Sequence, residues 1–202
     1  PPESMNSTKT AIILLSRSGG GKGTQAEFLR EYFGKEKALS ITTGDGFRDL
    51  AKRADLLAGK YIQEKVLDVG EKAPDFSTIW IWANRMIYEF TPETSVVIFD
   101  GTPRTRLEAQ ALDEALEFFE IENVKPLLLD VERKEAIQRL LSRARADDTR
   151  ERIERRLAYY ERTVKPAIEY YKIESKNQLI VIDGMPLPEK VFEQIKRVVS
   201  SK

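Results

Sequence analysis

A run of glycines and a lysine lies between an apolar segment and an amphipathic segment near the start of the chain. The apolar segment covers residues 10–15, the loop SRSGGGKGTQ covers residues 16–25, and an amphipathic helix is expected over residues 25–32. Glycines allow successive backbone N–H groups to turn inward around an anion, and a helix start adds positive potential. Lys22 supplies a mobile cation there. This stretch predicts a strand, a phosphate-binding loop and a helix.

The loop departs from the general phosphate-loop pattern GxxxxGK[ST] at two positions. Ser16 stands where the first glycine is expected, and Gly23 stands where serine or threonine follows the lysine. A plain flexible turn is the alternative, and three glycines followed by Lys-Gly-Thr argue against it. Residues 21–26 also fit the dinucleotide fingerprint GxGxx(G/A), although six residues alone are a weak match.

The rest of the chain repeats the alternation of strands and helices. Almost continuously apolar runs, typical of strands buried on both faces of a parallel sheet, occupy residues 10–15, 38–42, 95–99, 125–131 and 178–182. Amphipathic helices are expected between them, over residues 25–32, 75–90, 107–119 and 149–171. This order predicts an α/β fold of three layers around a five-stranded parallel sheet, in one domain over residues 5–202.

The interval between the second and third strands is too long for one crossover helix. We expect a small helical insertion at residues 44–74, followed by the helix that contains Trp80 and Trp82. We expect both tryptophans to pack in the core and not to stack on a base.

The charge pattern bears on the partners. The sequence has 33 basic and 33 acidic residues, a net charge of zero, which argues against a nucleic acid or a membrane surface as the partner. Residues 133–165 nevertheless hold eleven basic and six acidic residues, an excess that favours a small anionic ligand.

The sequence contains no cysteine and no histidine. This composition excludes disulfides, cysteine nucleophiles, histidine bases and the usual zinc sites. It fits the reducing cytoplasm, where we expect the protein to act. No apolar run approaches the ~20 residues that a membrane helix needs, and no secretory signal is visible.

Four landmarks together resemble one known family. The sequence Gly-Lys-Gly-Thr-Gln after the first strand resembles the signature loop of adenylate kinases and related nucleoside monophosphate kinases. The second landmark, TTGDGFR at residues 42–48, resembles the motif that opens the monophosphate-binding subdomain of this family. This resemblance implies that Thr43 lies beside the adenine and that Arg48 binds the AMP phosphate. UMP/CMP kinases typically carry alanine at the position of Thr43, so this residue favours AMP.

The third landmark, DGTPR at residues 100–104, resembles the family sequence DG(F/Y)PR. It implies that Asp100 holds the water shell of Mg²⁺, that Gly101 lies in the AMP site, and that Arg104 pairs with the AMP phosphate. Glu108 stands where the family has a glutamine that reads the adenine edge. A carboxylate can accept a hydrogen bond from the adenine amino group, but it cannot donate one to a ring nitrogen.

The fourth landmark is a series of arginines. Arg139, Arg143, Arg145 and Arg156 resemble the arginine pattern of the family, in which Arg139 would lie over the ATP base and the others would neutralise the transferring phosphoryl group. A solvated helix face is the alternative, and we assign it to Arg150, Arg152 and Arg155. Only Ala144 separates Arg143 from Arg145, where family members place several residues, so residues 143–147 are expected to form a vestigial lid.

The resemblance implies a P-loop NTPase fold and the reaction Mg·ATP + AMP ⇌ 2 ADP. Lys22 with Arg104, Arg143, Arg145 and Arg156 would carry catalysis, and the donor phosphates would be held by the loop residues Gly19, Gly20, Gly21, Lys22, Gly23 and Thr24. Thr24 is a second candidate for the metal site. A homo-oligomer could cover the donor site in place of the lid. The alternatives are a UMP/CMP kinase, a nucleotide-binding protein impaired in transfer, and an oxidoreductase, for whose second half the chain has no room.

Overall fold

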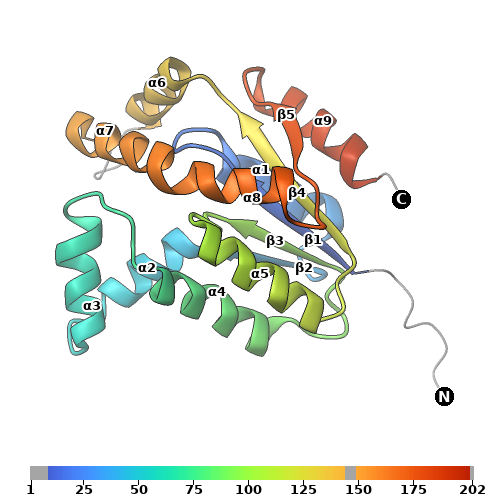
Figure 1. Cartoon of the computed structure of the whole chain (residues 1–202), viewed down its shortest axis with the longest axis horizontal. Helices are drawn as coiled ribbons and strands as arrows, with labels where there is room; N and C mark the ends of the chain where they lie inside the picture. Colours follow the sequence, from blue (N-terminus) through green and yellow to red (C-terminus); the bar gives the residue numbers. More distant parts are fainter. Residues whose placement is uncertain (1–8, 144–148, 201–202) are drawn as a thin grey trace.

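The computed structural model describes residues 9–143 and 149–200. Within them, five strands form one parallel sheet in the order β2-β3-β1-β4-β5 (Figure 1). Their bounds are Thr10–Leu15 for β1, Ala38–Thr42 for β2, Val96–Asp100 for β3, Asn123–Asp130 for β4 and Ile180–Asp183 for β5. All five predicted strands are confirmed. The bounds of β1 and β2 match the prediction, and those of the others differ by one or two residues.

The central strand shows why these runs are apolar without alternation. All six residues of β1 are buried. Ile13 packs in a cluster with Phe99 on one face of the sheet, whereas Ile12 packs with Ile98 on the other face. Successive side chains of a strand point to opposite faces, so a sheet covered on both sides needs apolar residues at every position.

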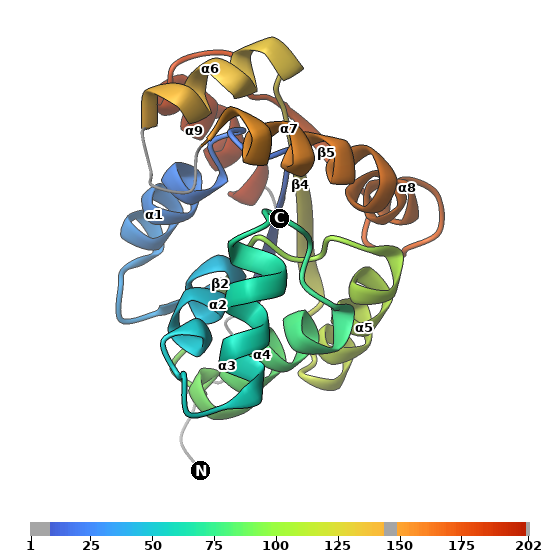
Figure 2. The same ribbon diagram turned by 90° about the vertical axis from the view of Figure 1, so that its left-hand side faces the viewer.

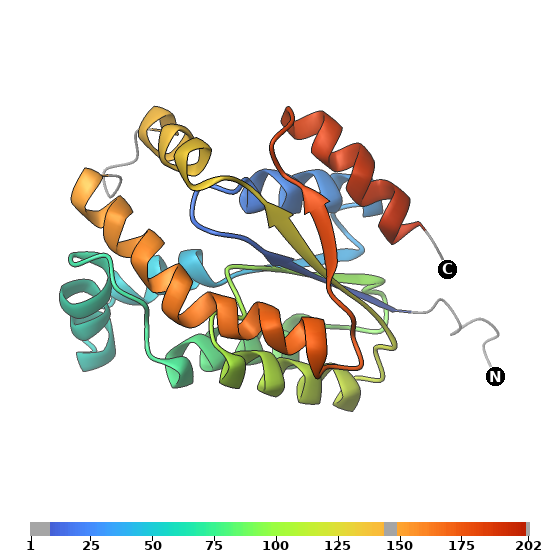
Figure 3. The same ribbon diagram turned by 45° about the horizontal axis from the view of Figure 1, so that its top comes forward.

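Helices cover both faces of this sheet (Figures 1 and 3). One face carries α4 (Asp75–Glu89), α5 (Arg106–Phe118) and the run of α7 (Arg150–Tyr159), the π-helical turn η2 (Tyr160–Val164) and α8 (Lys165–Ile173). The other face carries α1 (Lys22–Phe33) and α9 (Pro188–Val199). The predicted three-layer α/β fold is therefore confirmed. Among the described residues, no helix is long and apolar enough to cross a bilayer.

A helical segment lies between β2 and α4, as expected. It consists of α2 (Thr43–Ala51), α3 (Leu57–Ile62) and the π-helical turn η1 (Gln63–Leu67), and it has a small core of its own around Phe47 and Ile62. Its assignment as a monophosphate-binding insertion stays a prediction. Further along the chain, α6 (Arg133–Arg143) follows β4 and precedes residues 144–148. The expected vestigial lid at residues 143–147 falls almost entirely outside the described residues.

The two tryptophans of α4 differ, and the expectation that both lie in the core is wrong for Trp80. Trp82 is 2% exposed and packs edge-on against Phe99, with ring centroids 6.5 Å apart, whereas Trp80 is 57% exposed. Residues two apart on a helix lie on different faces, so one core cannot receive both side chains.

This difference predicts unequal effects of truncation. We expect Trp82→Ala to lower the free energy of unfolding by about 3–5 kcal/mol, because it empties a packed site. The matched control Trp80→Ala should change it by about 0.5 kcal/mol or less, as is usual for exposed positions. Urea unfolding of both variants measures these values, and equal losses would contradict the packing described here.

Candidate functional site

A cavity of about 940 Å³ opens at the carboxyl ends of the strands. This end faces the viewer in Figure 2. The volume is near the upper limit of typical ligand sites, about 300–1,000 Å³. Ligands of open parallel sheets bind at this edge. The lining comes from stretches that are far apart in the sequence: residues 18–27, 100–104 and 184–188, and parts of the stretches 44–48 and 66–73.

The glycine-rich loop forms one wall of this cavity. It leads from β1 into α1, and its last residue before the helix, Gly21, has φ 85°. The Gly20 N–H donates to Arg17 O at 3.1 Å, and Lys22 Nζ donates to Ser16 O at 3.0 Å and to Arg17 O at 3.2 Å. The strand, loop and helix follow one another as predicted. The binding of phosphate by these residues stays a prediction.

The structure explains why serine stands at position 16, where the general loop pattern has glycine. The buried hydroxyl of Ser16 donates to Leu129 O on β4 at 2.7 Å. A β-carbon added at Gly20 would lie 1.8 Å from Ser16 Oγ. Ser16 therefore occupies the space beside Gly20 and ties the loop to the neighbouring strand.

Asp100 and Thr24 are the candidate metal residues, and both line the cavity. Asp100 is the last residue of β3, and a β-carbon added at Gly23 of the loop would lie 3.5 Å from Asp100 Oδ2. Among the described residues, no three Asp, Glu, His or Cys side chains form a metal cluster. Mg²⁺ commonly keeps several waters and binds through one or two carboxylates together with substrate phosphates. One carboxylate beside the glycine-rich loop fits that donor set.

Arg104 and Arg48 line the same cavity. Arg104 Nε donates to Gly101 O at 2.8 Å, and one terminal nitrogen donates to the Tyr159 hydroxyl at 3.4 Å. Both partners are uncharged, so these contacts orient the guanidinium without cancelling its charge. Arg48 lines the cavity from α2 and forms an ion pair with Asp45.

Arg104 Nε and Thr43 Oγ1 both donate hydrogen bonds to the carbonyl oxygen of Gly101. The φ of Gly101, 88°, lies in the left-handed region, and an added β-carbon would lie 2.8 Å from Thr43 Oγ1. We expect Gly101→Ala to lower the free energy of unfolding by about 1–3 kcal/mol. Gly21→Ala is the matched control, because Gly21 has φ 85° and open space around its added β-carbon. Denaturant unfolding should give the larger loss at Gly101, and equal losses would mean that the close approach to Thr43 costs nothing.

Two predicted residues of the AMP site do not line the cavity. Thr43 is fully buried and donates to Gly101 O at 3.0 Å. Glu108 is also fully buried, and its Oε2 accepts a hydrogen bond from the Arg104 backbone N–H at 2.6 Å. Both residues thus contact the 101–104 turn. Their contact with a nucleotide stays a prediction.

The predicted arginines are distributed unevenly. Arg139 and Arg156 line the cavity, and Arg139 donates to Gly184 O at 3.1 Å and to Met185 O at 3.0 Å. The Arg143 side chain and all of Arg145 lie outside the described residues. Arg152, which we expected on a solvated helix face, is half-buried and also lines the cavity.

Sequence reasoning missed Arg152, Tyr159 and the 184–188 segment, all of which line the cavity. Residues 152, 156 and 159 follow the i, i+4, i+7 spacing of one helix face. This spacing could have indicated that Arg152 and Tyr159 lie on the same face as Arg156. The 184–188 segment follows the last strand and carries no motif. Its place follows only from the parallel arrangement of β5.

Comparisons with known proteins give consistent matches. The family model described as adenylate kinase matches residues 14–176. An adenylate kinase of Thermus thermophilus is 34% identical over 190 residues, which cover 92% of this chain and 95% of the relative. An adenylate kinase of Bacteroides fragilis is 36% identical over 194 residues, with 94% and 98% covered, and one of Clostridium tetani is 32% identical over 221 residues, with 94% and 98% covered.

Proposed function

Because this chain belongs to the adenylate kinase family, we propose that it transfers the terminal phosphoryl group of Mg·ATP to AMP and so forms two ADP. The observation that carries this proposal is a single cavity lined both by Lys22 with the glycine loop and by Arg48 with Arg104. A protein that only binds ATP has no use for the second set of cations.

The donor phosphates are proposed to bind at the loop. The backbone N–H groups of residues 19–24 and the start of α1 would hold them, and Lys22 would exchange its two loop carbonyl partners for phosphate oxygens. Arg139, which is anchored on the carbonyls of Gly184 and Met185, would lie beside the ATP base.

The acceptor phosphate is proposed to bind Arg48 and Arg104. One of its oxygens would attack the terminal phosphorus of ATP in line, as the bond from that phosphorus to the bridging oxygen breaks and ADP leaves. Such a transfer needs positioning and charge neutralisation more than a strong base, so a chain without histidine can perform it. Arg156 in the cavity wall, together with Arg143 and Arg145, would neutralise the moving phosphoryl group.

Mg²⁺ bound with ATP would neutralise phosphate charge during the transfer. Asp100 would hold its water shell, and Thr24 is a further candidate from the loop. A cytoplasmic location also stays part of the proposal, since a sequence without cysteine is compatible with a reducing compartment.

An acceptor panel tests the proposal. Purified protein with Mg·ATP is given AMP, CMP or UMP, and ADP is quantified. We expect two ADP for each AMP consumed and little product with CMP or UMP. Preference for CMP or UMP would support a UMP/CMP kinase, and ATP binding without transfer would support an impaired binding protein. The family of the relatives favours neither alternative.

The contraction between Arg143 and Arg145 leads to a further expectation. A lid excludes water from the transferring phosphoryl group, so a very short one should leave the donor site open to hydrolysis unless a second copy of the chain covers it. We expect either phosphate release from ATP without AMP, or a homo-oligomer in solution. A phosphate assay measures the hydrolysis of ATP without AMP, and light scattering measures the oligomeric state. A monomer with negligible hydrolysis would contradict both.

A further inference from the structure

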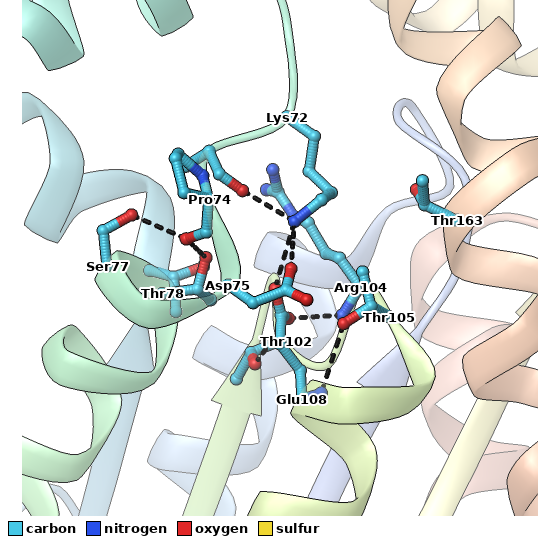
Figure 4. Close-up of polar contacts among 12 residues, drawn as sticks. Lys72, Pro74, Asp75, Ser77, Thr78, Thr102, Arg104, Thr105, Glu108 and Thr163 are labelled. Carbon is cyan, nitrogen blue, oxygen red and sulfur yellow. Dashed lines mark hydrogen bonds and ion pairs between the residues drawn. The ribbon is translucent and has the colours of Figure 1, made fainter.

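Glu108 binds the turn that carries Arg104. It is the third residue of α5, whose N-cap Thr105 accepts a hydrogen bond from the Glu108 N–H at 3.1 Å (Figure 4). Its Oε2 accepts hydrogen bonds from the Arg104 N–H at 2.6 Å and from Thr102 Oγ1 at 3.3 Å. The carboxylate therefore fixes the backbone of the arginine that faces the acceptor phosphate.

The remaining oxygen of Glu108 faces a lysine from another part of the chain. Glu108 Oε1 is buried without a hydrogen-bond partner among the residues that the structure describes, and Lys72 Nζ lies 3.6 Å from it. Lys72 follows η1 in the helical segment, and its side chain is only 16% exposed. It also donates to Ala73 O at 2.6 Å and forms an ion pair with Asp75 (Figure 4). Lys72 thus connects the helical segment to the carboxylate beneath Arg104.

Lys72 is one of the groups that favour the charged form of this carboxylate. Burial raises the pKa of Glu108, while the Arg104 N–H and the charges of Lys72 and Arg104 act in the opposite direction and Asp75 raises it further. A buried charge left without its partner is strongly destabilising. Loss of Lys72 should therefore disturb the contact between Glu108 and the Arg104 backbone.

We infer that Lys72 is a positioning residue for the acceptor site, which acts on Arg104 through Glu108. This inference rests on the proposed function, because Arg104 matters here as the ligand of the acceptor phosphate. It differs from the expectation that Glu108 reads the adenine edge. The side chain of Glu108 is fully buried and does not line the cavity, so in this arrangement it acts on the nucleotide through Arg104.

Lys72→Met separates this role from general damage. We expect KM for AMP to rise about tenfold, while KM for ATP changes by less than about twofold. Lys72→Arg, which keeps the charge, should stay close to the wild type. The double variant Lys72→Met/Glu108→Gln should recover most of the affinity, because the amide oxygen still accepts from Arg104 N–H without a buried charge. Lys52→Met is the matched control, since Lys52 is an exposed lysine of α2's C-cap paired with Asp49.

A ligand pair distinguishes positioning from base reading. AMP and purine riboside monophosphate differ by the exocyclic amino group, and the ratio of their kcat/KM values should be the same in the wild type and in Glu108→Gln. A changed ratio would overturn the inference, as would a Lys72→Met enzyme with unchanged KM for AMP or with equal rises for both substrates. If Lys72→Met does not fold, KM for AMP is compared between Lys72→Met/Glu108→Gln and Lys72→Met/Glu108→Leu. Only the leucine variant lacks an acceptor for the Arg104 N–H, so its KM for AMP should be higher, and equal values would overturn the inference. A wild-type protein that forms no ADP would instead refute the proposed function.

Discussion

Lys22→Met is expected to lower kcat for ADP formation by about 1,000-fold, with the fold intact. Lys22 is the first residue of α1 and lines the cavity, and its ammonium group contacts the carbonyl oxygens of Ser16 and Arg17. Methionine keeps the length of the side chain but removes the charge that would follow the phosphoryl group during transfer. The loss should therefore appear in kcat more than in either KM, because the interaction is strongest in the transition state.

A coupled assay at saturating ATP and AMP measures this effect. Lys35→Met is the matched control. Lys35 is an exposed lysine just after the end of α1, and it forms ion pairs with Glu27 and Glu31 of that helix. Far-ultraviolet circular dichroism and a melting curve establish that both variants fold. A Lys22→Met enzyme that retains more than about a tenth of the wild-type kcat would contradict the role given to the loop.

Arg104→Met is expected to lower kcat/KM for AMP by about 100-fold, with a much smaller change in KM for ATP. The guanidinium is oriented by Gly101 O and the Tyr159 hydroxyl, both uncharged, so its charge is available to an anionic acceptor. Arg104→Lys should recover only part of the loss, because an ammonium group cannot form two parallel hydrogen bonds to one phosphate.

Steady-state kinetics with each substrate varied in turn tests this prediction. Arg106→Met is the matched control: Arg106 lies two residues further along the chain, is exposed, and forms an ion pair with Glu174. Equal losses for AMP and ATP, or a fully active Arg104→Lys enzyme, would show that Arg104 does not act as the acceptor ligand.

The sequence was sufficient where one local pattern decides the structure. The strand β1 is buried at all six positions because both faces of the sheet are covered, and its almost continuously apolar run was enough to predict its bounds. The glycine loop followed from glycines beside a lysine between a strand and a helix. Trp80 and Trp82 were treated alike although their spacing places them on different faces of α4, so this error could have been avoided.

Contacts between distant segments could not be predicted in this way. Lys72 and Glu108 are separated by 36 positions in the sequence, and their pairing depends on how the segment after η1 packs against α5. The burial of Glu108 could not be predicted from the sequence either, because a glutamate at the third position of a helix is ordinarily exposed. Position in a motif predicted which element carries each residue, whereas the direction of its side chain required the structure.

Single-turnover transfer of a labelled phosphoryl group tests whether this protein moves the terminal phosphate of ATP to AMP. Protein in excess over ATP labelled at its terminal phosphate is mixed with Mg²⁺ and AMP, and the labelled products are separated. We expect the label to appear in ADP, at the phosphate added to AMP, before any appears as free phosphate. Label that appears only as free phosphate, or that remains in ATP while the protein is saturated with both nucleotides, would contradict it.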